Sequence, residues 1–160
     1  MLIQDKNPID TFSLMLRLSV GSINSLSSSL NKAIPLILAG LGISIMNSVK
    51  LWNIGAEGQI FLGAIAVNYL YINTQFNNPT LHIFVLLIAG FFGGALCILI
   101  PAITKVVFGV NEIITTLLTN YIVFGITIFL INGPWKREGI ASTGGTDIFD
   151  KASWVPTIIT

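Results

Sequence analysis

The chain has 160 residues, of which 53% are hydrophobic and 9% charged, and its mean hydropathy is +0.83. Soluble domains carry about 25% charged residues, so this composition is typical of a membrane protein. The net charge of +1 argues against nucleic-acid binding, and one cysteine with one histidine excludes a disulfide framework and the common zinc sites.

The first part of the chain, residues 1–32, has apolar residues at nearly helical spacing from Ile9 to Leu30, with serines between them. This pattern predicts an extracytoplasmic amphipathic helix that lies along the membrane surface, and a loosely ordered serine-rich lead-in is the alternative. Ala33–Val49 has no formal charge and, at ~1.5 Å per residue, is just long enough to cross the ~30 Å hydrocarbon core. It is the first predicted span.

The stretch Leu51–Gly63, LWNIGAEGQIFLG, interrupts the apolar region with glycines and a carboxylate. A carboxylate at the centre of a spanning helix costs roughly 2.5–3.5 kcal/mol on insertion scales, so Glu57 should face protein, water or a substrate. The second predicted span, Glu57–Ile72, is short for a full crossing. This shortness predicts a discontinuous helix with its break near Asn53–Gly58.

Ile83–Ile103 is the third predicted span. Small residues on it allow another helix backbone to come close, and they are the predicted helix-packing residues: Gly90, Gly93, Gly94 and Cys97. Pro101 lacks an N–H group and predicts a kink near the end of this span.

The fourth predicted span is Ile113–Ile131, and Asn111 and Glu112 suit its start as a cap and an acidic first-turn residue. Polar residues recur along it at intervals of three and four: Glu112, Thr115, Thr116, Thr119, Asn120 and Thr127. Such a stripe should not face lipid. It either bonds to neighbouring helices or lines a solvated pathway, and both interpretations stay open.

The predicted fold is therefore an all-α, polytopic transmembrane bundle with about four spans over residues 33–131. Residues 132–160 are predicted to form an extracytoplasmic loop and the start of a further span. Lys50 and Lys105 are the only bases in the short connections, which places those connections in the cytoplasm.

Three motifs, LWNIGAEGQIFLGA, KVVFGVNEIITTLLTNY and INGPW, occur here together with NPIDTF and AIPLILAGLGISI. In order and spacing they resemble the membrane-spanning permease subunits of bacterial ABC importers in the simple-sugar and nucleoside branch, most closely the front half of a nucleoside permease. An incomplete chain is therefore expected. The resemblance implies a multi-pass protein of the bacterial cytoplasmic (inner) membrane that helps to move nucleosides or related sugars across the bilayer.

The resemblance also implies partners: ABC ATPase subunits, a second permease subunit and an extracytoplasmic solute-binding protein. No G-x-x-x-x-G-K-[ST] phosphate loop occurs in these 160 residues, so ATP hydrolysis is expected in a separate subunit. The chain is expected to need no cofactor or metal and to have no enzymatic activity of its own.

For the solute path, the hypothesis is that the break brings helix-end amides and polar side chains toward the membrane interior, as broken helices do in other transporters. Amide side chains suit ribose hydroxyls or base edges, and aromatic rings can stack on a base. The candidate residues are Trp52, Asn53, Glu57, Gln59, Phe61, Asn68, Glu112, Thr116, Asn120 and Tyr121. For Glu57 the alternative is that it caps the half-helix and bonds a neighbouring span.

Two other classes of function stay open. The chain could be a non-transporting structural or assembly subunit, or a truncated remnant, that packs through Gly90-x-x-x-Gly94. An intramembrane enzyme would use Glu57 and Glu112 as acid and base, but no serine–histidine, cysteine–histidine or metal set accompanies them.

Overall fold

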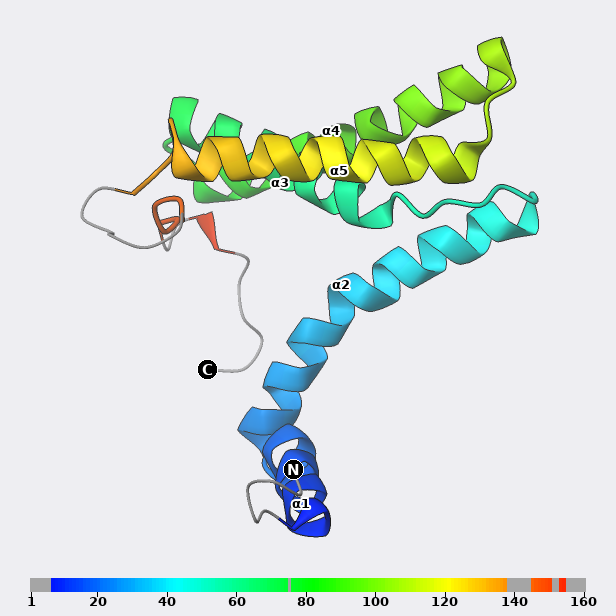
Figure 1. Ribbon diagram of the computed structural model, residues 1–160. Coiled ribbons are helices and arrows are strands. Elements are labelled where there is room, and N and C mark those ends of the chain that lie inside the picture. The colour runs from blue at the N-terminus through cyan, green and yellow to red at the C-terminus, as the bar shows by residue number, and fades with distance from the viewer. Residues whose placement is uncertain (1–6, 75, 138–144, 151–152, 155–160) are drawn as a thin grey trace. The chain divides into compact units, whose positions relative to one another are not determined.

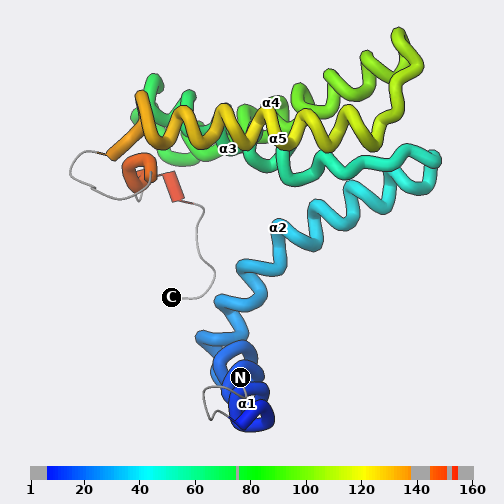
Figure 2. The backbone as a smooth tube through the Cα atoms, in the orientation of Figure 1, coloured from blue at the N-terminus to red at the C-terminus, as the bar shows by residue number. Residues whose placement is uncertain are grey.

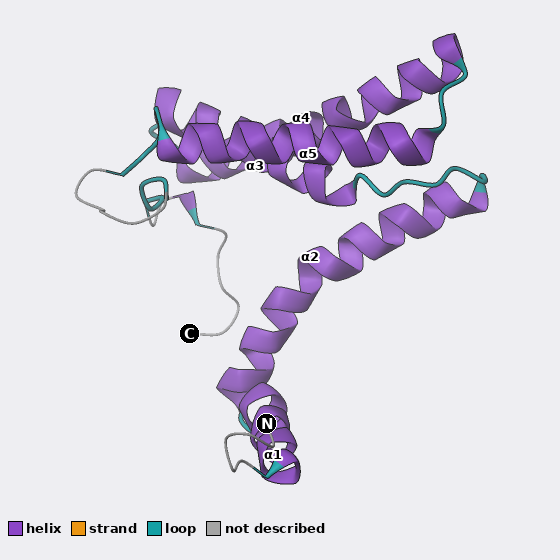
Figure 3. Cartoon of the chain, viewed as in Figure 1, coloured by secondary structure: helices purple, strands orange, loops and turns teal. Residues whose placement is uncertain are grey.

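The computed structural model describes residues 7–74, 76–137, 145–150 and 153–154. These residues form five α-helices and no strand (Figures 1 and 3). The predicted all-α fold is confirmed. The chain divides into two compact units, Met1–Val49 and Lys50–Thr160, each with its own helices.

The first unit contains α1 (Pro8–Val20) and α2 (Ile23–Ser48), which pack against each other. α1 begins where it does because the Asn7 side chain accepts a hydrogen bond from the Ile9 amide at 3.1 Å. Pro8 fits the first helical position, where its missing N–H group costs nothing.

The prediction of one continuous helix over Ile9–Leu30 is wrong. Ser22 has extended backbone angles, and its side chain accepts a 3.1 Å hydrogen bond from the Ser25 amide, so it ends one helix and caps the next. α2 then continues through Pro35 into the predicted first span, and Lys32 lies inside a helix. The surface location of residues 1–32 stays a prediction.

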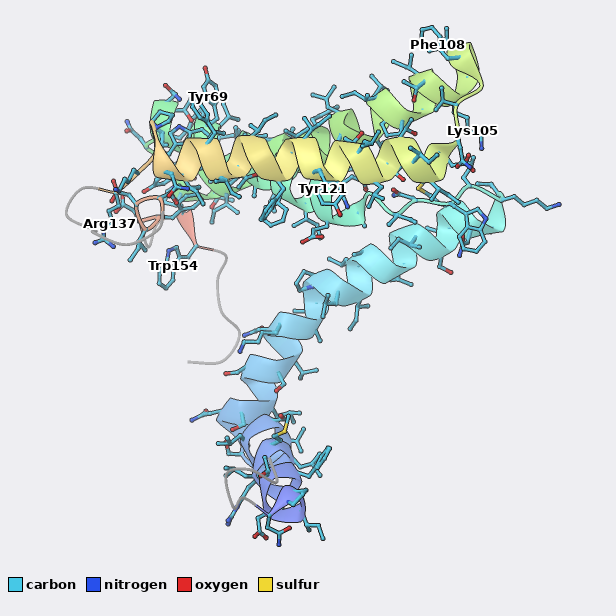
Figure 4. The ribbon with its side chains drawn as sticks, in the orientation of Figure 1. Tyr69, Lys105, Phe108, Tyr121, Arg137 and Trp154 are labelled. Carbon is cyan, nitrogen blue, oxygen red and sulfur yellow. The ribbon has the colours of Figure 1, made fainter. Side chains whose placement is uncertain are left out.

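The second unit is built from three helices: α3 (Ala56–Asn73), α4 (Pro79–Phe108) and α5 (Glu112–Asn132). Each packs against the other two, and they lie side by side in Figure 2. Lys105 lies at one end of this unit, whereas Arg137 and Trp154 lie at the other (Figure 4).

The contact between α3 and α4 depends on glycine. A β carbon on Gly93 would lie 2.8 Å from Ala66 Cβ and 2.9 Å from the Leu62 carbonyl oxygen. A β carbon on Gly63 would lie 2.9 Å from the carbonyl oxygen of Gly90. The two backbones are thus too close for larger residues at these positions. Of the predicted helix-packing residues, three glycines face α3 and the cysteine is buried: Gly90, Gly93, Gly94 and Cys97.

Three helices of the described chain are long and apolar enough to cross a membrane: α2, α4 and α5. α3, with 18 residues, is not among them, so a span at Glu57–Ile72 stays a prediction. Large apolar side chains are exposed on all three helices, for example Leu36 at 73%, Phe91 at 70% and Phe129 at 68%. Apolar surface on this scale suits lipid rather than water. The fold is therefore a helical membrane bundle.

The turn between α4 and α5 is set by short-range contacts. Gly109 ends α4 in the left-handed region, with φ 65°, and its amide donates to the Lys105 carbonyl at 3.0 Å. Asn111 caps α5 by accepting from the Ile113 amide at 2.9 Å, and Glu112 in the first turn pairs with the Lys105 ammonium at 2.8 Å. The predicted roles of Asn111 and Glu112 at the start of this helix are confirmed.

Gly109→Ala is expected to lower the free energy of unfolding by about 1–2 kcal/mol, because an L-residue in the left-handed region meets its own following carbonyl. Unfolding in mixed micelles titrated with dodecyl sulfate, followed by circular dichroism, would measure the loss. Gly125→Ala in α5 is the matched control, since a β carbon there has no neighbour within 4 Å. Equal losses in the two variants would contradict the explanation.

Candidate functional site

The candidate site is built around the non-helical stretch Leu51–Gly55, which precedes α3. Lys50, just before it, has a φ of 58°, which is uncommon for a residue with a side chain. Inside the stretch, Asn53 is buried and its Oδ1 accepts a 2.8 Å hydrogen bond from the Gly55 amide. Non-helical backbone at membrane depth needs such partners within the protein, because lipid offers none.

α5 supplies the remaining partners. The Asn120 side chain uses both ends of its amide: Oδ1 accepts from the Gly58 amide at 2.7 Å, and Nδ2 donates to the Ile54 carbonyl at 2.9 Å. One turn earlier, Thr116 Oγ1 accepts a longer, 3.4 Å bond from the Ile54 amide. We call the two bonds of Asn120 the Asn120 clasp. It ties the last non-helical residues and the first turn of α3 to one side chain of α5.

This contact explains why residue 58 is a glycine. A β carbon on Gly58 would lie 2.5 Å from Asn120 Oδ1 and 3.1 Å from Asn120 Cα. Gly55 is nearly as restricted, because its β carbon would lie 3.2 Å from Thr116 Cβ. The two glycines of the motif therefore let the chain approach α5 closely enough for the clasp to form.

A pocket of about 220 Å³ opens beside the clasp, between α3 and α5. Its lining includes Phe61 and Phe124, whose rings meet edge to face with centroids 5.8 Å apart. Tyr121, labelled in Figure 4, lies midway along α5. We call this space the break pocket, and its lining residues are Glu57, Phe61, Leu117, Asn120, Tyr121 and Phe124.

Glu57 is exposed in the first turn of α3, where its charge opposes the positive end of the helix dipole. Gly55, the N-cap residue, gives α3 no side-chain cap. Among the residues that the structure describes, the Glu57 carboxylate makes no hydrogen bond or ion pair. The described contacts thus leave Glu57 facing the break pocket rather than bonded to a neighbouring helix.

The polar stripe of α5 is mostly satisfied by its own helix. The hydroxyls of Thr116, Thr119 and Thr127 each donate to the carbonyl four residues earlier, at 2.7–2.8 Å. Thr116 and Thr119 are also buried. Three members of the stripe bond to the non-helical stretch: Thr116 and Asn120 bond to Ile54, and the Glu112 carboxylate accepts from the Trp52 backbone. The stripe therefore acts mainly in packing and in holding the break.

The structure brings together four of the ten predicted solute-path residues in the break pocket: Glu57, Phe61, Asn120 and Tyr121. The other six are not among its lining residues: Trp52, Asn53, Gln59, Asn68, Glu112 and Thr116. Trp52 is 58% exposed, and Glu112 is paired with Lys105. Asn68 is buried in α3, and its Nδ2 has no hydrogen-bond partner in the described part of the chain.

Two lining residues, Leu117 and Phe124, do not belong to the predicted set. They lie three residues before and four residues after Asn120, which places all three on one face of α5. Their helical spacing from Asn120 could have identified them from the sequence. The predicted set omitted them because on α5 it followed the polar residues and Tyr121.

The sequence model of a protein family, described as the permease component of the branched-chain amino acid transport system, matches residues 25–156. A glucose ABC transporter permease protein of Haloferax volcanii is 34% identical over 148 residues, which is 92% of this chain and 37% of the relative. A nucleoside ABC transporter permease protein of Lactococcus lactis is 31% identical over 132 residues, covering 82% of this chain and 36% of the relative.

A guanosine ABC transporter permease protein of Bacillus subtilis is 34% identical over 113 residues, or 70% of this chain and 32% of the relative. The chain thus spans between 32% and 37% of the length of these curated relatives. No solved structure matches it.

Proposed function

The chain belongs to the family of branched-chain amino acid transport system permease components, and from this premise we propose that it forms part of the solute path of an ABC importer for nucleosides or related sugars. The family match and the three membrane-capable helices make it a multi-pass protein of the cytoplasmic membrane and a transporter component. The relatives named for glucose, nucleosides and guanosine support the solute class.

The observation that carries the proposal is the break pocket. A discontinuous helix in a transporter places helix-start amides and unwound backbone beside the solute. Here the pocket lies beside the first two turns of α3: Asn120, which bonds the Gly58 amide, lines it, and Glu57, Phe61 and Tyr121 add a carboxylate and two rings. A carboxylate accepts bonds from sugar hydroxyls, and aromatic rings stack on a base or a sugar face.

The proposed importer needs further subunits. We expect ATPase subunits on the cytoplasmic side, a second permease subunit in the bilayer and a solute-binding protein on the outer side. ATP would then be used by the ATPase alone. The predicted orientation places Lys105 and the turn that follows it in the cytoplasm. The surface Ile103–Asn111 is the part of this chain that we expect to meet the ATPase.

Glu57→Gln is expected to reduce nucleoside or sugar uptake about tenfold. The change replaces a charged carboxylate with a neutral amide, whose single oxygen accepts weaker hydrogen bonds from solute hydroxyls. The measurement is uptake of labelled uridine, guanosine and glucose by cells that carry the complete transporter, normalised to the amount of protein in the membrane. Stability should fall by no more than about 0.3–1 kcal/mol, because Glu57 makes no hydrogen bond or ion pair with the described residues and the change removes only its interaction with the helix dipole.

Asp10→Asn is the matched control, because it also removes a carboxylate from the first turn of a helix, α1. Its uptake should equal that of the wild type. A loss of stability in Glu57→Gln with unchanged solute affinity would overturn the solute contact. Absence of uptake for every sugar and nucleoside tried would overturn the transport function itself.

The structure argues against the alternative of a structural subunit that packs on another protein through Gly90-x-x-x-Gly94. That glycine face is covered by α3 of the same chain, so it is not free for a second protein. The acid–base pair of an intramembrane enzyme is likewise not assembled, because Glu57 lines the break pocket while Glu112 pairs with Lys105 outside it.

A further inference from the structure

One face of α5 holds the backbone of the non-helical stretch and of the first turn of α3. The side chains that do so lie four residues apart, and this spacing places them on one face of the helix: Glu112, Thr116 and Asn120. Their partners, in the same order, are three backbone amides: Trp52, Ile54 and Gly58. We call the three side chains the α5 ladder. The ladder fixes the backbone that borders the break pocket.

Glu112 is the end of the α5 ladder that also contacts α4. Its carboxylate pairs with the Lys105 ammonium at 2.8 Å, and the Lys105 and Glu112 side chains are 37% and 19% exposed. Because the pair is partly shielded, salt weakens it less than a fully exposed pair. The Glu112 carbonyl oxygen accepts a 2.7 Å hydrogen bond from the Thr116 hydroxyl, the next member of the ladder. One residue thus connects the last turn of α4 with the non-helical stretch.

The turn that carries Lys105 presents apolar side chains to its surroundings. Val106 is 85% exposed and Phe108 is 72% exposed. Phe108 lies at the same end of the unit as Lys105 (Figure 4). The predicted orientation places this end in the cytoplasm, where lipid tails do not cover such side chains. Exposed apolar surface outside the bilayer suits contact with another protein, here the ATPase expected at Ile103–Asn111.

We propose that Glu112 is a positioning residue, through which movement of the surface Ile103–Asn111 changes the shape of the break pocket. This role rests on the proposed importer function, because the ATPase is what moves that surface. Lys105 and the Trp52 amide share one carboxylate, so a displacement of the last turn of α4 is passed to the non-helical stretch. The other bonds of the α5 ladder pass it on to the start of α3.

The test follows two spin labels in the complete transporter in lipid nanodiscs, without nucleotide and with a non-hydrolysable ATP analogue. One label is attached through Trp52→Cys, since that side chain is 58% exposed and the backbone amide of residue 52 is kept. The other is attached through Ile100→Cys in α4, at a 59% exposed position outside the surface Ile103–Asn111. Cys97 and any other cysteines are replaced by alanine. With Glu112 in place, both spectra should change with nucleotide, and no change at residue 52 would overturn the proposal.

Glu112→Ala removes both contacts of the carboxylate. The label at residue 100 should still respond to nucleotide, whereas the label at residue 52 should lose its response. Solute uptake should fall at least about fivefold, the lower end of the usual coupling between two sites. Unchanged responses at both positions would overturn the proposal. Loss of both responses would mean that the variant disturbs the whole unit, and would overturn it as well.

A charge swap separates this role from that of a structural ion pair. Lys105→Glu combined with Glu112→Lys keeps an ion pair, but a lysine cannot accept a hydrogen bond from the Trp52 amide. The label at residue 52 should therefore stay unresponsive in the swapped chain. Recovery of its response would mean that the ion pair alone is enough, and would overturn the role of the Trp52 contact.

Arg137→Met is the matched control, because it breaks the 3.4 Å ion pair with Asp147, and Arg137 lies at the other end of the unit from Lys105 (Figure 4). Both labels and solute uptake should behave as they do without this change. Wild-type uptake that Glu112→Ala leaves unchanged would overturn this proposal while the proposed transport function stands. Absence of uptake by the wild type, for every sugar and nucleoside tried, would overturn the transport function and this proposal with it.

Discussion

Asn120→Leu is expected to destabilise the α3–α5 unit by about 2–4 kcal/mol. The change removes the acceptor of the Gly58 amide and the donor to the Ile54 carbonyl together. Each backbone group left unpaired away from water costs about 1–3 kcal/mol. Unfolding in mixed micelles titrated with dodecyl sulfate, followed by circular dichroism, would measure the loss. Asn73→Leu is the control, because among the described residues the exposed Asn73 side chain bonds only to the Tyr69 carbonyl of its own helix.

A double-mutant cycle tests whether the loss comes from the clasp itself. Gly58→Ala should also destabilise the unit, because its β carbon would lie 2.5 Å from Asn120 Oδ1. The cycle uses Asn120→Ala, which removes the 2.5 Å contact with Oδ1 and leaves the 3.1 Å contact with Cα. Gly58→Ala and Asn120→Ala should therefore cost less together than the sum of their separate losses. Strict additivity would contradict the clasp. The same variants should lower solute uptake, because the clasp shapes the break pocket.

The features that the sequence predicts well are those that depend on local pattern. The glycines predict an interruption, and residues 51–55 are indeed non-helical, although Ala56–Gly58 of the predicted break Asn53–Gly58 already belong to α3 and the discontinuous spanning helix stays a prediction. The start of α5 follows from Asn111 and Glu112. The close approach of α4 to another helix follows from the four-residue spacing of Gly90 and Gly94. Each of these signals lies within a few residues of the structure that it determines.

The partners of these features are not local, and this limits prediction of the site. Asn120 bonds to residues 62 and 66 positions earlier in the chain, and no spacing rule connects them. As a sequence feature, Asn120 looked equally suited to solute and to packing. Its two bonds to the backbone show that it shapes the break. Among the described lining residues, the Glu57 carboxylate and the Tyr121 hydroxyl are then the polar groups that can meet a solute.

The division of the first helix shows the opposite failure, in which a local signal was present and a longer pattern hid it. Gly21 and Ser22 form a helix stop followed by a cap, yet the apolar spacing continues across them from α1 into α2. Periodicity alone does not show a turn that falls between two amphipathic helices with similar spacing. To predict where a helix ends, the capping residues must be considered together with the spacing of the apolar residues.

Gly93→Ala is expected to cost about 1–3 kcal/mol in stability, because added volume in a closely packed contact forces the backbones apart. Two of the three atoms that a β carbon would meet belong to the backbone of α3: the Leu62 carbonyl oxygen at 2.9 Å and Gly63 Cα at 3.0 Å. A backbone cannot move aside as a side chain does. Unfolding titrations of the purified chain would show the loss as a lower midpoint.

Two further variants make this prediction specific to the helix contact. Ala66→Gly in the Gly93→Ala background removes the third clash, at 2.8 Å, and should restore only part of the stability because the two backbone contacts remain. Gly125→Ala, with no neighbour within 4 Å of its β carbon, should cost nothing. Full rescue by Ala66→Gly would mean that the side chain alone limits the approach. Equal losses at Gly93 and Gly125 would mean that the substitution acts within one helix, and the close packing of α3 on α4 would then not be what the glycine provides.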